Sequence, residues 1–159
     1  MRIASASWRS FLLVALAAIS FSPHSLAQEK KIKRSDLPPA VDNAVSSLGA
    51  GARISGFAEE REKGQTFYEV QMVVDGHTKD VLLDRTGAVV EVEEEVALDK
   101  LPDEVKQGLM AKAKQGKLTK VESLTKHGKL VAYEAQVMTG RVKSEVQVGP
   151  EGIPLDHEE

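Results

Sequence analysis

The sequence predicts an α+β fold of two tandem units, each a helix plus a three-stranded antiparallel meander, in sheets with helices on one face. Three observations predict it: residue types that recur at a fixed offset, a helix start in each copy, and alternating runs after it. The recurring pairs, at offsets of 64 and then 65 residues, are Leu37 with Leu101, Val41 with Val105, Val45 with Leu109, Tyr68 with Tyr133, Val81 with Val146 and Gly87 with Gly152.

Each copy opens with a predicted helix. A proline, which is favoured in the first turn, is followed by apolar residues at helical spacing. In the first copy these residues run from Val41 to Leu48 and the pattern ends at Gly49. In the second they run from Leu101 to Ala113 and the pattern ends near Gly116. One face of each helix is therefore expected to be apolar.

Three strands are predicted after each helix. Apolar and polar residues alternate through residues 68–74 and 131–137, as is typical of half-buried strands. The pairs Asp75-Gly76 and Thr139-Gly140 lie between alternating runs and predict hairpins. Because a single unit buries little apolar area, we expect the two units to share a core or a continuous sheet. The strands preceding these runs are expected at 53–62 and 117–126.

The first residues carry the features of a secretory signal. Arg2 and Arg9 precede or border an apolar run at 11–21, and Ser25-Leu26-Ala27 supplies small residues for cleavage after Ala27. The apolar run is too short to cross a bilayer, which takes roughly 20 residues. The predicted organisation is a signal peptide at 1–27, a disordered polar tail at 28–35, a first unit at 36–96 and a second unit at 97–159.

Composition indicates the compartment and the class of partner. The chain has no cysteine, which fits a periplasmic protein, with secretion to the medium as the alternative. Removal of the signal takes away Arg2 and Arg9 but no acidic residue, so the net charge changes from −3 to −5. A negative chain is a poor partner for nucleic acid. We therefore expect an extracytoplasmic protein partner and no membrane span after cleavage; the oligomeric state is left open.

No constellation for catalysis is visible in the sequence. An enzyme needs a nucleophile with a base, a metal cluster or paired carboxylates in a dry pocket. His77, His127 and His157 fall in turns or near the last residue, and no two stand at a metal-ligand spacing. The sequence therefore predicts a protein that is not an enzyme, with no catalytic, cofactor-binding or metal-binding residues and no cofactor.

A run of acidic residues at Glu91, Glu93, Glu94 and Glu95 alternates in part with valine. We interpret it as an acidic strand edge, because charged edges discourage pairing between molecules. Clustered carboxylates can also hold calcium, although this run lacks the spacing of a calcium loop. Binding of calcium or another small ligand at the acidic edge therefore stays open as the alternative function.

The polar face of the predicted sheets is the candidate partner surface. Apolar residues exposed among polar neighbours form a mixed surface of the kind that protein interfaces use. A solvated face, or packing of one unit on the other, is the alternative. The predicted partner-binding residues are Phe67, Glu69, Gln71, Val73, Glu134, Gln136, Met138 and Lys143.

Three short segments resemble a known family. Tyr68-Glu69-Val70, Asp75-Gly76 and residues 84–91 resemble a PepSY-type domain, particularly the PepSY-like class related to beta-lactamase inhibitor proteins. The resemblance spans residues 36–155. It implies tandem units of a helix and a three-stranded meander, and a binding role in the envelope or outside the cell. It also implies inhibition or regulation of a peptidase or another envelope enzyme through the exposed sheet face.

Overall fold

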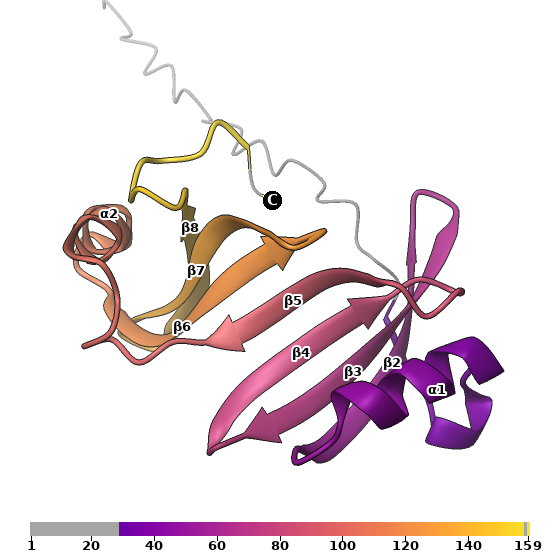
Figure 1. Cartoon of the computed structure of the whole chain (residues 1–159). Helices are drawn as coiled ribbons and strands as arrows, with labels where there is room; N and C mark the ends of the chain where they lie inside the picture. The colour runs from indigo at the N-terminus through magenta and orange to yellow at the C-terminus, as the bar shows by residue number, and fades with distance from the viewer. Residues whose placement is uncertain (1–28, 158) are drawn as a thin grey trace, which may run out of the picture.

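The computed structural model describes residues 29–157 and 159, which form strands, two α-helices and one short 3-10 helix (Figure 1). The predicted signal peptide lies outside the described residues. In chain order the elements are β1 (Lys30–Lys31), η1 (Arg34–Asp36), α1 (Pro39–Leu48), β2 (Arg53–Glu62), β3 (Gln65–Val74), β4 (His77–Leu83), β5 (Val89–Glu95), α2 (Asp103–Ala113), β6 (Lys117–Lys126), β7 (Lys129–Thr139) and β8 (Val142–Val148).

All eight strands form one antiparallel sheet in the order β1 to β8, so each strand pairs with its neighbour in the sequence (Figure 1). The predicted architecture of two tandem helix plus three-stranded units is therefore wrong. Five strands precede α2, three follow it, and β5 pairs directly with β6, with Glu93 opposite Leu124. This pairing satisfies backbone groups that would otherwise lie on two open edges, which explains why one sheet forms.

The continuous sheet also corrects the interpretation of the acidic run. β5 carries Glu91, Glu93, Glu94 and Glu95, and it lies between β4 and β6. The run is therefore an interior strand and does not protect an edge. Its side chains divide between the two faces of the sheet, because successive residues of a strand point in opposite directions.

Local sequence explains where the strands begin and end. β2 and β6 have the predicted bounds, and each is followed by a lysine or histidine with positive φ and then a glycine. The turn between β7 and β8 falls at Gly140-Arg141, one residue later than predicted. Thr139 stays in β7 because it pairs with Val142.

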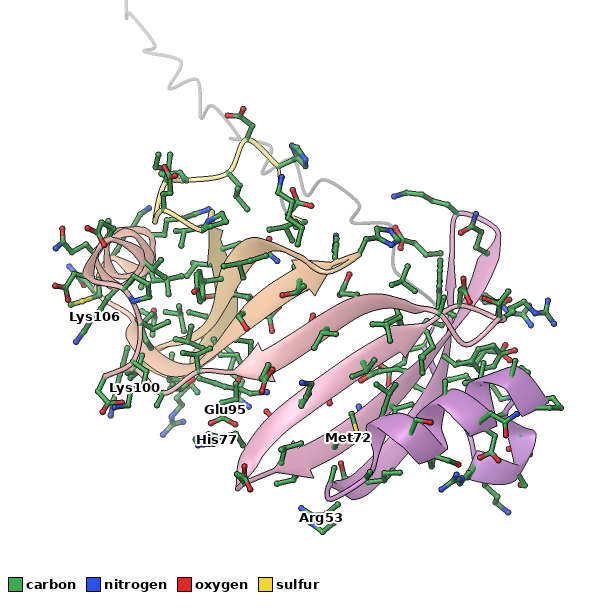
Figure 2. All side chains as sticks on the ribbon, viewed as in Figure 1. Arg53, Met72, His77, Glu95, Lys100 and Lys106 are labelled. Atoms are coloured by element: carbon green, nitrogen blue, oxygen red, sulfur yellow. The ribbon has the colours of Figure 1, made fainter. Side chains whose placement is uncertain are left out.

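Two apolar cores lie between the sheet and its helices. α1 buries Val41 and Val45, and Met72 lies beneath this helix (Figure 2). α2 buries Val105 and Leu109 in a separate core. The strand registers place both cores on the same face of the sheet. Buried strand residues of the first core are Tyr68, Val70, Met72, Val81 and Leu83, and those of the second are Val121, Ala135 and Val148.

Close contacts hold each helix against a turn. Gly87 has a φ of 83°, and a Cβ added there would lie 2.6 Å from the carbonyl oxygen of Ala40 in α1. Gly152 has a φ of 75°, and a Cβ there would collide with the carbonyl of Glu104 in α2. Larger residues at these two turns would push the helices off the sheet.

Residues 28–35 were expected to be a disordered polar tail, but within residues 30–36 the structure shows a short strand and a 3-10 helix. Lys30 and Lys31 pair with Glu59 and Ala58 of β2. The N–H of Ile32 donates a hydrogen bond of 3.0 Å to the carbonyl of Phe57, and the side chain of Ile32 packs against the first core.

The described part of the chain contains no helix long and apolar enough to cross a membrane.

Candidate functional site: the open face of the sheet

We call the sheet face opposite the two helices the open face. The registers place all eight predicted partner-binding residues on it, in one group on β3 and another on β7 and β8. The two groups are separated in the sheet by β4, β5 and β6. The prediction thus names residues of one face but omits the strands that join them.

The apolar character expected for this face differs from what the structure shows. Phe67, Val73 and Met138 are half-buried, although they were expected to be exposed. The large apolar side chains that are exposed lie elsewhere, including Val142 at 66% and Ile153 at 62%. The open face is therefore distinguished by its charged groups, and apolar patches do not define it.

An acidic groove lies on the open face over β2 to β5. It has a volume of about 220 Å³. The registers bring its residues together, because Asp80 lies opposite Glu93 and Leu82 lies opposite Glu91. We use the name acidic groove for the lining residues Glu60, Glu69, Asp80, Leu82, Glu91 and Glu93.

Burial within the acidic groove disfavours the charged carboxylates. Burial, followed by the charge of neighbouring Glu122, raises the pKa of Glu93 to about 8. Burial and then a hydrogen bond with Glu69 raise the pKa of Glu60 to about 7. Burial and the charge of Glu69 raise the pKa of Asp80 to about 6. Glu93 and, in part, Glu60 therefore hold protons near neutral pH.

Few basic groups offset these acids. Among the described residues, no ion pair involves Glu60, Glu69, Asp80 or Glu93. The pKa of Glu91 is also raised by burial, although Lys126 opposes this shift from 3.8 Å away. The groove is thus an acidic surface with little internal compensation.

The part of the open face over β6 to β8 is built differently. Lys120 Nζ lies 2.6 Å from Glu122 Oε1, and Glu122 is buried. No neutral donor reaches that oxygen among the described residues, so the lysine is its partner. Burial alone would lower the pKa of Lys120, but the hydrogen bond and charge of Glu122 outweigh it and raise the pKa. Gln147 Nε2 donates a hydrogen bond of 2.6 Å to Glu134 Oε2.

One group of carboxylates has a geometry that could hold a metal ion. Oxygens of Asp80, Glu93 and Glu122 all lie within 4.8 Å of one another. Oxygen ligands suit calcium and magnesium. However, Glu122 already pairs with Lys120, and the pKa of Glu93 lies at about 8, so the group does not carry three free negative charges at neutral pH.

Glu95, another member of the acidic run, stabilises the sheet itself. Glu95 Oε2 accepts hydrogen bonds from the backbone N–H and the hydroxyl of Thr78, at 3.0 and 3.1 Å. These bonds, led by the backbone one, lower the pKa of Glu95. His77 lies beside Glu95 at the start of β4 (Figure 2), with Nδ1 4.0 Å from Oε1. His77 is half exposed and belongs to a strand end, away from the acidic groove.

Sequence reasoning missed the contributions of Glu60 and Glu91 to the groove and the central place of Asp80. The signal for Glu60 was present, since the turn Lys63-Gly64 closes a hairpin that sets it opposite Phe67. For Glu91 the missing information was the pairing of β5 on both sides.

Solved structures share this fold. A DUF2874 family protein from Bacteroides ovatus is 20% identical, with a TM-score of 0.59 over 76% of this chain and 85% of that chain. A protein from Bacteroides eggerthii, provisionally described as periplasmic, is 20% identical, with a TM-score of 0.60 over 74% and 84%. A BLIP-like protein from Bacteroides fragilis is 22% identical, with a TM-score of 0.55 over 76% and 83%.

These likenesses concern the fold. No family model matches the chain, and no curated protein matches it. The PepSY resemblance is thus supported only at the coarser level of a BLIP-like fold. The description of the B. eggerthii protein agrees with the periplasmic location predicted from the sequence. The chain has the fold seen in DUF2874 family proteins and in a BLIP-like protein.

Proposed function

We propose that the chain is an exported, non-catalytic binding protein of the periplasm that docks a basic segment of an extracytoplasmic protein on its open face. The observation that carries the proposal is the acidic groove, whose Glu60, Glu69, Asp80 and Glu93 form no ion pair among the described residues. In the finer form of the proposal, the chain is PepSY-like and the partner is a peptidase or another envelope enzyme that it inhibits or regulates.

The shape of the site supports a protein partner. The acidic groove lies on a broad sheet face, and it is open along β2 to β5. Half-buried Phe67 and Leu82 lie on the same face as the carboxylates. A lysine or arginine of the partner can reach the carboxylates while its aliphatic stem covers these apolar side chains.

The charges support a basic partner. Placing a cation among carboxylates favours their ionised form. A bound lysine or arginine would therefore lower the raised pKa values of Glu60, Asp80 and Glu93 and release protons. Affinity for a basic segment should accordingly increase as the pH rises from about 5 to about 8.

The same shifts support a non-catalytic role. Acid–base catalysis by two carboxyls uses environments that push their pKa values apart, with one group protonated and the other ionised. Burial raises the pKa of each of Glu60, Asp80, Glu91 and Glu93. Burial, with repulsion between neighbouring carboxylates added to it, explains this common direction without a catalytic pair.

Titration with defined peptides tests the proposal. We would measure the affinity of a lysine- and arginine-rich peptide by calorimetry at pH 7.5, with a glutamate-rich peptide of equal length as the negative probe. Glu69→Lys should weaken binding of the basic peptide roughly tenfold or more, because it places a cation at the groove. Adding Glu134→Lys should weaken it further.

Glu94→Lys is the matched control, because Glu94 is exposed and points to the other face, where it pairs with Lys79 at 3.1 Å. It makes the same charge change away from the groove and should alter the affinity by less than about twofold. Equal losses in the Glu69 and Glu94 variants, or equal binding of both peptides, would exclude the open face as the docking surface.

Binding of a divalent cation is the alternative use of this face, and the grouping of Asp80, Glu93 and Glu122 is the observation that favours it. Calcium at millimolar concentration would then raise the melting temperature, and Glu93→Gln would abolish the increase. An unchanged melting temperature would reject the alternative and leave the basic-segment proposal intact.

A further inference from the structure

The outer edge of β8 is the second surface of interest. β8 is the last strand of the sheet and pairs with β7 alone, except that Val148 forms a bridge with Pro154. Among the described residues, the edge from Val142 to Gln147 therefore has no strand beside it. At the opposite side of the sheet, β1 covers part of β2.

The backbone direction along this edge follows from the bridge. The N–H of Gly149 donates a hydrogen bond of 2.8 Å to the carbonyl of Ile153, so Gly149 turns its N–H outward. Backbone groups alternate in direction along an antiparallel strand. Lys143 and Glu145 accordingly present N–H and C=O outward, while Ser144 and Val146 turn theirs toward Val137 and Ala135 of β7.

We propose that residues 142–146 of β8 pair antiparallel with the same residues of a second copy of this chain, with Ser144 opposite Ser144 and with the bridge between Val148 and Pro154 kept. In this register the outward backbone N–H and C=O of Lys143 lie opposite those of Glu145 in the other copy and can form hydrogen bonds with them. The two-fold axis generates the same contact a second time. Both residues are exposed and lie on the open face. Opposite charges directly across a strand pair are stabilising.

Neighbouring registers are less favourable. Centring the pair on Glu145 sets two glutamates opposite each other, and centring it on Lys143 sets two lysines opposite each other, which is destabilising. If the two-fold axis passes between two consecutive residues of β8, outward backbone groups of one copy lie opposite inward groups of the other, so hydrogen bonds are lost. Charge complementarity therefore selects one register and one occupant, a second copy.

The register also covers apolar surface. Val142 is 66% exposed, the largest value among the exposed large apolar side chains of the described residues. Pairing centred on Ser144 brings it opposite Val146 of the second copy, on the helix-bearing face. The pairing thus removes an exposed apolar group from water as well as satisfying the open edge.

The dimer would display two open faces on the same side. The two-fold axis of an antiparallel strand pair stands perpendicular to the sheet, so both copies keep their helices on one face. A bivalent surface increases the apparent affinity for a partner that carries two binding segments. The self-pairing itself stands on the β8 edge and does not depend on the proposed function.

Sedimentation velocity of the protein without its signal segment tests the self-pairing, over concentrations from about 1 μM to about 1 mM. We expect a concentration-dependent dimer. Lys143→Glu and Glu145→Lys should each weaken dimerisation roughly tenfold or more, because each sets like charges opposite one another at two symmetry-related places. The double variant Lys143→Glu/Glu145→Lys should restore the affinity of the original chain.

Two controls separate pairing from general charge effects and from unfolding. Lys129→Glu makes the same charge change at the exposed start of β7 and should leave dimerisation unchanged. Glu145→Pro removes an outward N–H and should weaken the dimer without shifting the melting temperature by more than a few degrees. A monomer at every concentration, or a dimer that both single reversals leave unchanged, would overturn the proposal. Failure of the double variant to restore pairing would overturn the register.

Discussion

The open face over β2 to β5 differs from the open face over β6 to β8 in how its acids are balanced. In the first region, Glu60, Glu69, Asp80 and Glu93 lie around one groove and form no ion pair with any residue that the structure describes. In the second region, Glu122 has Lys120 beside it, and Glu134 accepts a hydrogen bond from Gln147. One region of the sheet thus has carboxylates that can pair with an added cation, and the carboxylates of the other region already have a lysine or glutamine partner.

This difference indicates where binding energy is available. A carboxylate that already has a buried partner gains little from a second cation, and an uncompensated one gains more. The first region therefore provides the attraction for a basic segment, and the second provides a stable extension of the sheet. Variants in the two cores, in the region over β6 to β8 and in the acidic groove test this difference in turn.

The largest effects are expected from the cores beneath the two regions. Leu83→Ala and Leu109→Ala remove fully buried side chains from the first and second core, and each should lower the free energy of unfolding by about 2–5 kcal/mol. Because one sheet joins the regions, both variants should shift a single thermal transition. Leu98→Ala, at a side chain that is 40% exposed, is the control and should cost little. Two separate transitions in calorimetry would contradict a cooperative sheet.

Removing the partner of Glu122 should make the second region resemble the first. Lys120→Met leaves a buried carboxylate without its lysine and should lower the free energy of unfolding by about 1–3 kcal/mol at pH 7. Chemical denaturation at pH 7 measures this loss. An unchanged free energy of unfolding would show that Glu122 does not depend on the lysine.

The acidic groove should make stability depend on pH. The folded-state pKa of Glu93 is about 8, above the ordinary value of 4.5, so the folded protein binds more protons than the unfolded chain between these values. Stability should therefore fall as the pH rises from about 5 to about 8. After discounting for solvent screening, we expect Glu93→Gln to stabilise the protein at pH 8 by about 1–2 kcal/mol, with little effect at pH 5.

Glu94→Gln serves as the control for that experiment, since Glu94 is exposed on the other face. It should give the same pH dependence as the original chain. If the two variants behaved alike in urea unfolding at both pH values, burial in the groove would not be the cause of the dependence.

The smallest effect is expected at the border between the regions. Lys126 lies 3.8 Å from Glu91 and 3.7 Å from Glu159, and these are long, partly solvated ion pairs. Lys126→Gln should change the free energy of unfolding by less than about 1 kcal/mol. It should nevertheless strengthen binding of a basic peptide, because it removes a competing cation from beside the groove. Weaker binding would show that Lys126 supports the groove.

The sequence revealed the strands more readily than their arrangement. Alternation predicted β3 and β7, and the strands before them, β2 and β6, were predicted with their bounds, because these signals depend on neighbouring residues. The pairing of β5 with β6 could not be read in this way, since α2 separates the two strands and nothing local specifies their register. The expectation of two tandem units failed at this contact.

The same limit applies to the candidate site. Alternation on β3 placed Glu69 and Gln71 on the polar face, and the acidic run was visible in the chain. Their convergence with Glu60 and Asp80 depends on pairings among four strands. Burial and raised pKa values follow from that convergence, so they were not predictable from the run alone.

Chemical-shift mapping can show residue by residue where a basic segment binds. A lysine- and arginine-rich peptide would be titrated into the isotopically labelled protein at pH 7.5, and the amide signals followed. We expect the shifts to concentrate on β2 to β5, around Glu60, Glu69, Asp80 and Glu93, and we expect Glu69→Lys to reduce them. Shifts confined to the helix-bearing face, or equal shifts with a glutamate-rich peptide, would contradict docking at the acidic groove.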